Sequence, residues 1–89
     1  MENISDYKLS RKPRIKDITG MSNTALHTQI KEGVFPPPIS IGDRAVAFVD
    51  SEINAVLAAR IAGKSKDEIK VIVAHLVEQR KNAGQVSNG

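Results

Sequence analysis

The apolar residues of this 89-residue chain recur at helical spacing in four stretches and at strand spacing in a fifth. Ile15 and Ile18, and then Leu26 and Ile30, lie three or four residues apart, as on one face of a helix. Alternation over 39–41 and 44–48 is typical of two short strands. Two longer helical stripes follow, formed by Ile53, Val56, Leu57 and Ile61 and then by Ile69, Ile72, Val73, Leu76 and Val77. The pattern predicts a mainly α-helical domain with one small β-hairpin.

Turn and capping residues separate the first two predicted helices. Gly20 can adopt the left-handed conformation that a sharp reversal requires, and Ser22 can cap the free amides of the second helix. Gly33 is expected to end that helix. Two short helices joined by a turn that contains glycine are typical of a helix-turn-helix, which we therefore predict over 15–33.

The predicted hairpin follows directly. Three consecutive prolines at 36–38 cannot continue a helix and favour an extended backbone. Gly42 and Asp43, with glycine first, are expected to form a type II′ turn, and Val46 and Phe48 should share one face of the returning strand. A two-stranded hairpin is barely stable alone, so it must pack on the helices. A hairpin in this position is called a wing, and the predicted fold is a winged helix-turn-helix with an added C-terminal helix.

The C-terminal half carries its own helix signals. Asp50 or Ser51 is expected to cap the third helix, while Ser65 and Glu68 have the spacing of a capping box for the fourth. Gly63 should end the third helix. Two interpretations of the fourth helix stay open: it completes the single core, or its apolar face pairs with a second copy to form a homodimer.

These patterns divide the chain into four parts. We expect a flexible basic N-terminal arm (1–13), a winged helix-turn-helix domain (14–63), a C-terminal amphipathic helix (64–83) and a flexible tail (84–89). From Lys8 onward, the end of the arm and the start of the first helix carry five cations with no acid among them until Asp17. They are solvated, or they contact DNA phosphates, where clustered positive charge releases counterions; both interpretations can hold. The cations are Lys8, Arg11, Lys12, Arg14 and Lys16.

Composition narrows the classes of function. Thirteen Lys and Arg against ten Asp and Glu give a net charge of +3 and a pI near 9.5, a weak argument for a polyanionic partner. The chain has no cysteine, and its two histidines, His27 and His75, fall on different predicted helices. No nucleophile motif, spaced carboxylate pair or glycine-rich phosphate loop is present. We expect no enzymatic activity, no cofactor and no metal site.

Location is suggested only by what the sequence lacks. No long apolar run near the N-terminus indicates a signal peptide or a membrane span. We expect a cytoplasmic protein, associated with the bacterial nucleoid and without membrane contact.

The second predicted helix carries the candidate chemistry. Four of its polar residues lie at i, i+3, i+4 and i+7, on one side of the helix: Thr24, His27, Thr28 and Lys31. Their hydrogen-bond donors and acceptors suit base edges and nearby phosphates. Arg44, at the hairpin tip, would probe a phosphate or the minor groove. The alternatives are an ordinary solvated helix face and a solvated turn residue. The candidate DNA-binding residues are Ser22, Asn23, Thr24, His27, Thr28, Lys31 and Arg44, with Arg14 and Lys12 beside them.

The segment from about Arg14 to Ile61 resembles the AlpA family of prophage regulators. These are small winged-helix proteins similar in architecture to phage excisionases and to the DNA-binding part of the MerR family. Four runs, in this order and spacing, carry the resemblance: Thr19 to Ser22, Ile30 to Pro36, Ile41 to Phe48, and Ser51 to Ile53. The resemblance implies sequence-specific binding to double-stranded DNA through the second helix and the wing. It also implies a role in transcription of an integrase gene, or in excision of a mobile element.

This chain departs from the family pattern at several positions. Asn23, His27 and Thr28 stand where the family commonly has Arg, an aromatic residue and Arg, and Phe48 and Leu57 replace usual tryptophans. With fewer cations on the reading helix, the basic arm and the wing tip would have to supply more of the affinity. The alternative function is a protein-interaction adaptor that contacts an integrase or a polymerase through the wing and the fourth helix. Activation, repression and excision are not separated by the residues.

Overall fold

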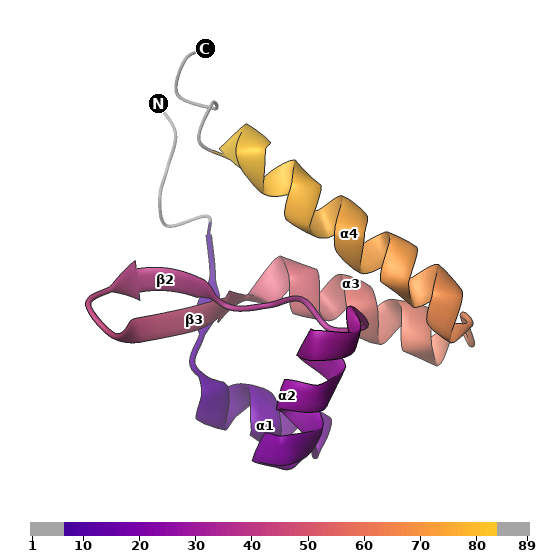
Figure 1. The fold of residues 1–89 in the computed structure, drawn as a ribbon, viewed down its shortest axis with the longest axis horizontal. Helices are drawn as coiled ribbons and strands as arrows, with labels where there is room; N and C mark the ends of the chain where they lie inside the picture. Colours follow the sequence, from indigo (N-terminus) through magenta and orange to yellow (C-terminus); the bar gives the residue numbers. More distant parts are fainter. Residues whose placement is uncertain (1–6, 84–89) are drawn as a thin grey trace.

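A computed structural model describes residues 7–83 of the chain, so expectations for residues 1–6 and 84–89 lie outside the described part. Four helices and a three-stranded antiparallel sheet of order β1-β3-β2 make up this region (Figure 1). The mainly helical fold with a small hairpin is therefore confirmed. The elements are β1 (Leu9–Ser10), α1 (Lys12–Thr19), α2 (Asn23–Glu32), β2 (Ile39–Gly42), β3 (Ala45–Val49), α3 (Asp50–Ile61) and α4 (Lys66–Ala83).

The helix-turn-helix forms through the local signals that the sequence carries. Helix α1 ends at Gly20, whose φ of 74° lies in the left-handed region that favours glycine. The Ser22 hydroxyl accepts a hydrogen bond from the backbone N–H of Ala25 at 3.1 Å and so caps α2. Gly33, with a φ of 82°, ends that helix. All three predicted roles are confirmed.

The N-terminal residues from 9 onward are ordered, which differs from the expected flexible arm. Strand β1 pairs with β3, with Leu9 opposite Val49 and Ser10 opposite Phe48. Ser10 is buried and its hydroxyl donates to Asp50 Oδ1 at 2.6 Å. Pairing with an edge of the hairpin thus fixes these residues, and α1 already begins at Lys12.

The same contact accounts for a second difference at the start of α3. Asp50 was expected to cap this helix, or else Ser51. The capping position is instead Val49, with no side-chain cap. The Asp50 carboxylate instead accepts a hydrogen bond from the Ser10 hydroxyl. This bond joins β1 to the base of the hairpin.

The hairpin turn lies one residue later than predicted. Gly42 pairs with Ala45, so the turn residues are Asp43 and Arg44, and Arg44 has a φ of 58°. A register shift between Ser40 and Gly42 places an extra residue in β2, which is a β-bulge. The core and β1 fix the position of β3 at its C-terminal end. The extra residue is therefore accommodated in β2, and the turn moves by one residue. The predicted type II′ turn with glycine first is therefore wrong.

The two residues expected to share one face of β3 differ in environment. Phe48 is 1% exposed, whereas Val46 is 41% exposed. Both point to the same side of the strand, but Val46 is nearer the tip, where β3 has left the helices (Figure 1). Only the base of the hairpin therefore contributes to the core.

The core joins the helix-turn-helix, the hairpin base and the C-terminal helices. The rings of Phe35 and Phe48 meet edge to face, with their centroids 6.1 Å apart and an interplanar angle of 67°. Helix α4 packs against α3, and its apolar face is part of this core. The structure thus supports the interpretation in which α4 completes the single core. The buried core residues are Ile15, Leu26, Val34, Phe35, Phe48, Ile53, Val56, Ala59, Ile69 and Val73.

Two predicted core positions are not buried. Ile61 is 87% exposed, because the buried face of α3 passes through Ile53, Val56 and Ala59. A helix turns about 100° per residue, so Ile61 lies roughly 200° around the helix from Ala59. Ile18 on α1 is also largely exposed. None of the helices within residues 7–83 is long and apolar enough to cross a membrane.

The predicted capping box of α4 is confirmed. The backbone N–H of Ser65 donates to Glu68 Oε1 at 2.8 Å, and the backbone N–H of Glu68 donates to Ser65 Oγ at 3.1 Å. Two hydrogen bonds with Ser65 lower the pKa of Glu68 below its ordinary value. The bond from the Ser65 backbone has the larger effect, and the bond with the Ser65 hydroxyl has the smaller one. The box therefore favours the ionised carboxylate.

This pKa direction predicts a pH-dependent contribution to stability. A carboxylate with a lowered pKa in the folded state stabilises the fold above the ordinary glutamate range and loses that contribution as pH falls through the folded pKa. Glu68→Gln keeps an acceptor but no charge. We expect its melting temperature to lie below that of the wild type at pH 7 and to approach it by pH 3, as measured by circular dichroism. A difference that stays constant over this range would contradict the prediction.

Candidate nucleic-acid interface

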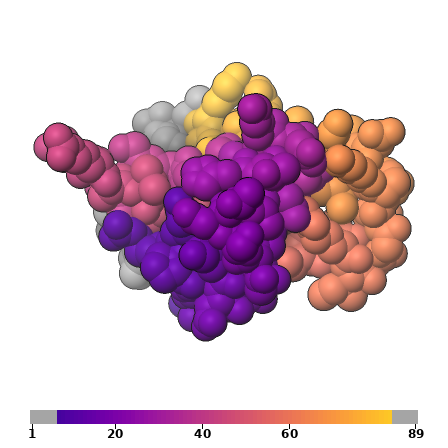
Figure 2. Space-filling view, turned by 60° about the horizontal axis from the view of Figure 1, so that its bottom comes forward, coloured from indigo at the N-terminus to yellow at the C-terminus, as the bar shows by residue number. Residues whose placement is uncertain are grey.

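The helix-turn-helix and the hairpin share one side of the molecule. Seen from that side, α1 and α2 form the near surface, and the β2–β3 tip projects at its edge (Figure 2). Most of helix α4 lies on the opposite side of α3 from α1 and α2, although its first residue, Lys66, pairs with Glu32 at the end of α2 at 3.2 Å (Figure 1). A long ligand could therefore contact α2 and the hairpin together without touching α4.

Helix α2 separates its apolar and polar residues as the sequence predicts. Leu26 is fully buried, and Ile30 packs against the core. The polar candidates are all exposed. The Ser22 oxygen is occupied by the helix cap, so this residue can offer its hydroxyl hydrogen but serves first to begin the helix. The exposed candidates on and before α2 are Ser22, Asn23, Thr24, His27, Thr28 and Lys31.

The first helix brings positive charge to this polar face. Lys12 Nζ lies 3.4 Å from His27 Nε2, so the beginning of α1 adjoins the middle of α2. Arg11 and Arg14 are exposed on the same helix end. Pro13 is tolerated here because the first amides of a helix have no partner within it. The contact places cations of α1 beside the uncharged polar groups of α2.

Arg44 lies at the tip of the hairpin, away from α2. It is exposed, and it is the only non-glycine residue with a positive φ in the described part of the chain. This conformation costs an L-residue about 1 kcal/mol. The structure therefore does not bring Arg44 to the polar face of α2; a ligand that touches both must extend along the surface.

A partly buried polar contact behind α2 was not predicted from the sequence. Arg60 on α3 donates through Nη2 to Gln29 Oε1 at 2.6 Å and to the Val34 carbonyl at 2.8 Å. These bonds fix the C-terminal end of α2 and the residue after its cap. The sequence does indicate that Arg60 is unusual. It lies seven residues after Ile53 and therefore falls on the apolar side of α3.

In the part of the chain that the structure describes, one groove at the base of the hairpin shows no arrangement of side chains suited to catalysis. This groove of about 540 Å³ lies between β1, the base of the hairpin and the end of α4. Its lining is mainly apolar, and its one carboxylate, Glu52, is held by Arg80. Within residues 7–83, no three His, Cys, Asp or Glu side chains are grouped as metal ligands would be. The candidate site is thus the exposed face of α1 and α2 with the hairpin.

Comparison with known proteins identifies relatives of phage origin. Residues 8–61 match the family described as prophage CP4-57 regulatory protein (AlpA). An uncharacterised protein, ORF88 of Enterobacteria phage P4, is 33% identical over 66 residues, which are 74% of this chain and 75% of that protein. No solved structure matches the chain. The match covers β1 through α3, and with it the whole candidate surface, so the chain belongs to the AlpA family of prophage regulatory proteins.

Proposed function

We propose that the protein binds a specific sequence of double-stranded DNA and thereby regulates a gene of a phage or prophage, with its integrase gene as the first candidate. The observation that supports this proposal is the exposed polar face of α2 with Lys12 of α1 beside it. Membership of a regulatory family of phage origin points the same way. Such a protein would act on DNA in the bacterial cytoplasm.

In this mechanism α2 enters the major groove, whose base edges carry a distinct donor and acceptor pattern for each base pair. Residues near the N-terminal end of a recognition helix approach the base edges, which assigns reading to Asn23, Thr24 and Thr28. His27 would form a hydrogen bond with a base edge, or donate one to a phosphate. Lys31, one turn after His27, would contact the backbone.

The remaining affinity would come from phosphate contacts on either side of α2. Lys12 and Arg14 would bind the backbone at the beginning of α1, and Arg44 would bind it, or reach the minor groove, at the wing tip. A duplex is long enough to touch both places at once. This division of roles matches the departure from the family pattern, because α2 itself carries one cation, Lys31, in its ten residues.

A DNA titration tests the proposal. Purified protein would be titrated into duplexes from upstream of the adjacent integrase gene and from the attachment-site region, with a scrambled duplex as the control, at two salt concentrations. Specific recognition predicts binding that prefers one fragment and weakens steeply with salt. A preference for the attachment region would indicate a role in excision. Weak binding that ignores sequence would favour the adaptor function, with an integrase or polymerase as partner.

Single substitutions separate reading from anchoring. Asn23→Ala or Thr28→Ala should change the base preference by about 1–3 kcal/mol at the contacted pair. Arg44→Ala should weaken binding to all sequences by a similar factor, because its expected target is backbone. Competition titrations with single-base variants of the preferred duplex measure both effects. Unchanged binding by all three variants would remove this surface from the mechanism.

A further inference from the structure

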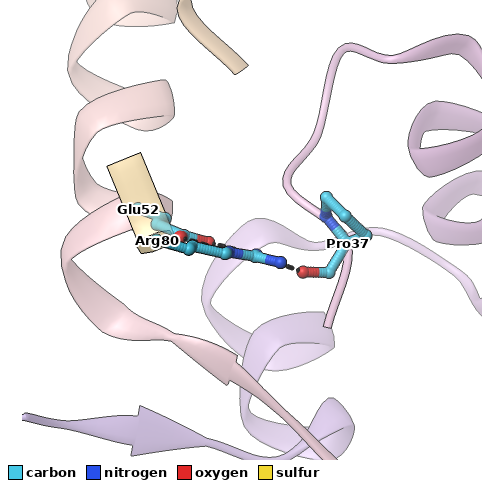
Figure 3. Close-up of polar contacts among 3 residues, drawn as sticks. All are labelled: Pro37, Glu52 and Arg80. Atoms are coloured by element: carbon cyan, nitrogen blue, oxygen red, sulfur yellow. Dashed lines mark hydrogen bonds and ion pairs between the residues drawn. The ribbon is translucent and has the colours of Figure 1, made fainter. Parts of the chain in front are cut away.

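A buried ion pair links the last helix to the base of the wing (Figure 3). Arg80 on α4 donates through Nε to Glu52 Oε2 at 2.7 Å and through Nη2 to Glu52 Oε1 at 2.6 Å. The same Nη2 donates to the Pro37 carbonyl at 2.7 Å. The side chains are 25% exposed for Arg80 and 7% for Glu52. The hydrogen bonds to Glu52 raise the pKa of Arg80 above its ordinary value.

These three residues lie where both strands of the hairpin leave the body of the protein. Pro37 is two residues before β2 begins at Ile39. Strand β3 runs into α3 without a loop, and Glu52 is the third residue of that helix. Arg80 therefore holds together the base of β2 and the base of β3. It does so from α4, which lies beyond residues 8–61 matched by the family.

Strand β3 is held at its base by β1 and by Phe48 in the core, but little else in the described structure holds β2. Strand β2 is an edge strand that pairs only with β3, and most of its residues are exposed. The segment before it is a run of three prolines, whose fixed φ angles make it stiff. A change of position at Pro37 would therefore be passed on to β2 and to Arg44 at the tip.

We propose that Arg80 is a positioning residue that sets the direction of the wing relative to α2. Its importance for DNA contact by Arg44 rests on the proposed function. An ion pair taken out of water adds little net stability, because desolvation offsets the attraction between the charges, but its geometry is specific. Two of the three Arg80 hydrogen bonds satisfy Glu52, while the third constrains only the backbone that leads into the wing. That third bond is the reason to assign positioning rather than stability.

The direct test measures wing orientation without DNA. The double variant Glu52→Leu/Arg80→Met removes both charges, leaves no unpaired ion and has no donor for Pro37. Residual dipolar couplings of the ¹⁵N-labelled protein report the direction of each backbone N–H. We expect the couplings of residues 40–46 to change. The couplings of α1 and α2 should still fit one common orientation of these two helices. Unchanged hairpin couplings would overturn the proposal, whatever the outcome with DNA.

Two further variants keep this test decisive. Lys81→Met removes one charge from the same helix at an exposed residue that pairs only with Glu78, and it should leave all couplings unchanged. Arg80→Lys retains the charge opposite Glu52 but lacks the planar fork that reaches both partners. It should shift the same hairpin couplings, by less. If the double variant does not fold, Arg80→Lys decides the question alone.

A double-mutant cycle then tests the consequence for DNA. With Arg44 present, Glu52→Leu/Arg80→Met should raise Kd by about five-fold, the effect expected when one phosphate contact is removed. In the Arg44→Ala background the same change should raise Kd less than about two-fold, since the phosphate partner of the wing tip is already absent. Equal effects in both backgrounds would overturn the link between Arg80 and Arg44. Failure of the wild type to bind any duplex would instead refute the proposed function. The dipolar couplings would still test the role of Arg80 in orienting the wing, because they are measured without DNA.

Discussion

Replacing Lys12, Arg14, Lys31 and Arg44 together with glutamine is expected to raise Kd for the preferred duplex about 100- to 1,000-fold. Each side chain is exposed on the candidate surface, except that Lys12 is partly covered beside His27. Removal of each phosphate-binding cation should also lower the slope of log K against log salt by about 0.9. The combined slope should therefore fall by about three to four. Fluorescence anisotropy at four salt concentrations measures both quantities.

A charge-matched control makes this prediction specific to the surface. A second quadruple variant would lose the same net charge at lysines of the loop before α4 and of α4 itself, which lies on the far side of α3 (Figure 1). It should lose less than about ten-fold in affinity, since only long-range attraction is reduced. Comparable losses in the two variants would show that net charge, rather than this surface, governs binding. The control lysines are Lys64, Lys66, Lys70 and Lys81. Because Lys66 pairs with Glu32 of α2 at 3.2 Å, a triple variant that keeps Lys66 should bind as this quadruple variant does.

The parts of the fold that follow from neighbouring residues could be predicted from the sequence. Gly20, Ser22 and Gly33 determine the turn and the ends of α2 by their own backbone and side-chain chemistry. Ser65 and Glu68 begin α4 in the same way. Such signals act within four residues, so they work wherever the segment lies in the fold.

The parts that depend on distant residues were missed. Strand β1 forms because Leu9 and Ser10 pair with the edge of β3, about 40 residues later in the chain. A two-residue strand has no periodicity from which it could be recognised. The position of the hairpin turn likewise depends on the register of β3 against β1 and the core, and that register is set outside the hairpin.

The candidate site was predicted in its composition and not in its arrangement. Helical spacing was enough to put Asn23, Thr24, His27, Thr28 and Lys31 on the exposed side of α2. It could not show that Lys12 lies against His27, because that contact depends on the angle between α1 and α2. The Arg80 contact with Pro37 was hidden for the same reason. In the sequence Arg80 is one of two cations at the end of a helix, a common arrangement that complements the helix dipole.

Phe48→Ala is expected to lower the free energy of unfolding by about 3–5 kcal/mol, the usual loss for a buried aromatic residue. Phe48 lies against Phe35 in the core, at the point where the wing joins the helices. A small domain has about 5–15 kcal/mol of stability in total, so a large share would be lost. Urea denaturation followed by circular dichroism measures the change.

The same strand supplies the control for this substitution. Val46 is two residues nearer the tip, on the same side of β3, and is 41% exposed where Phe48 is 1% exposed. Val46→Ala should cost no more than about 1 kcal/mol, since part of its surface is already in water. If the wing were an independent appendage, the two substitutions would have similar small effects. A loss confined to Phe48 would mean that the base of the wing is part of the core, while the tip, with Arg44, is free to meet a ligand.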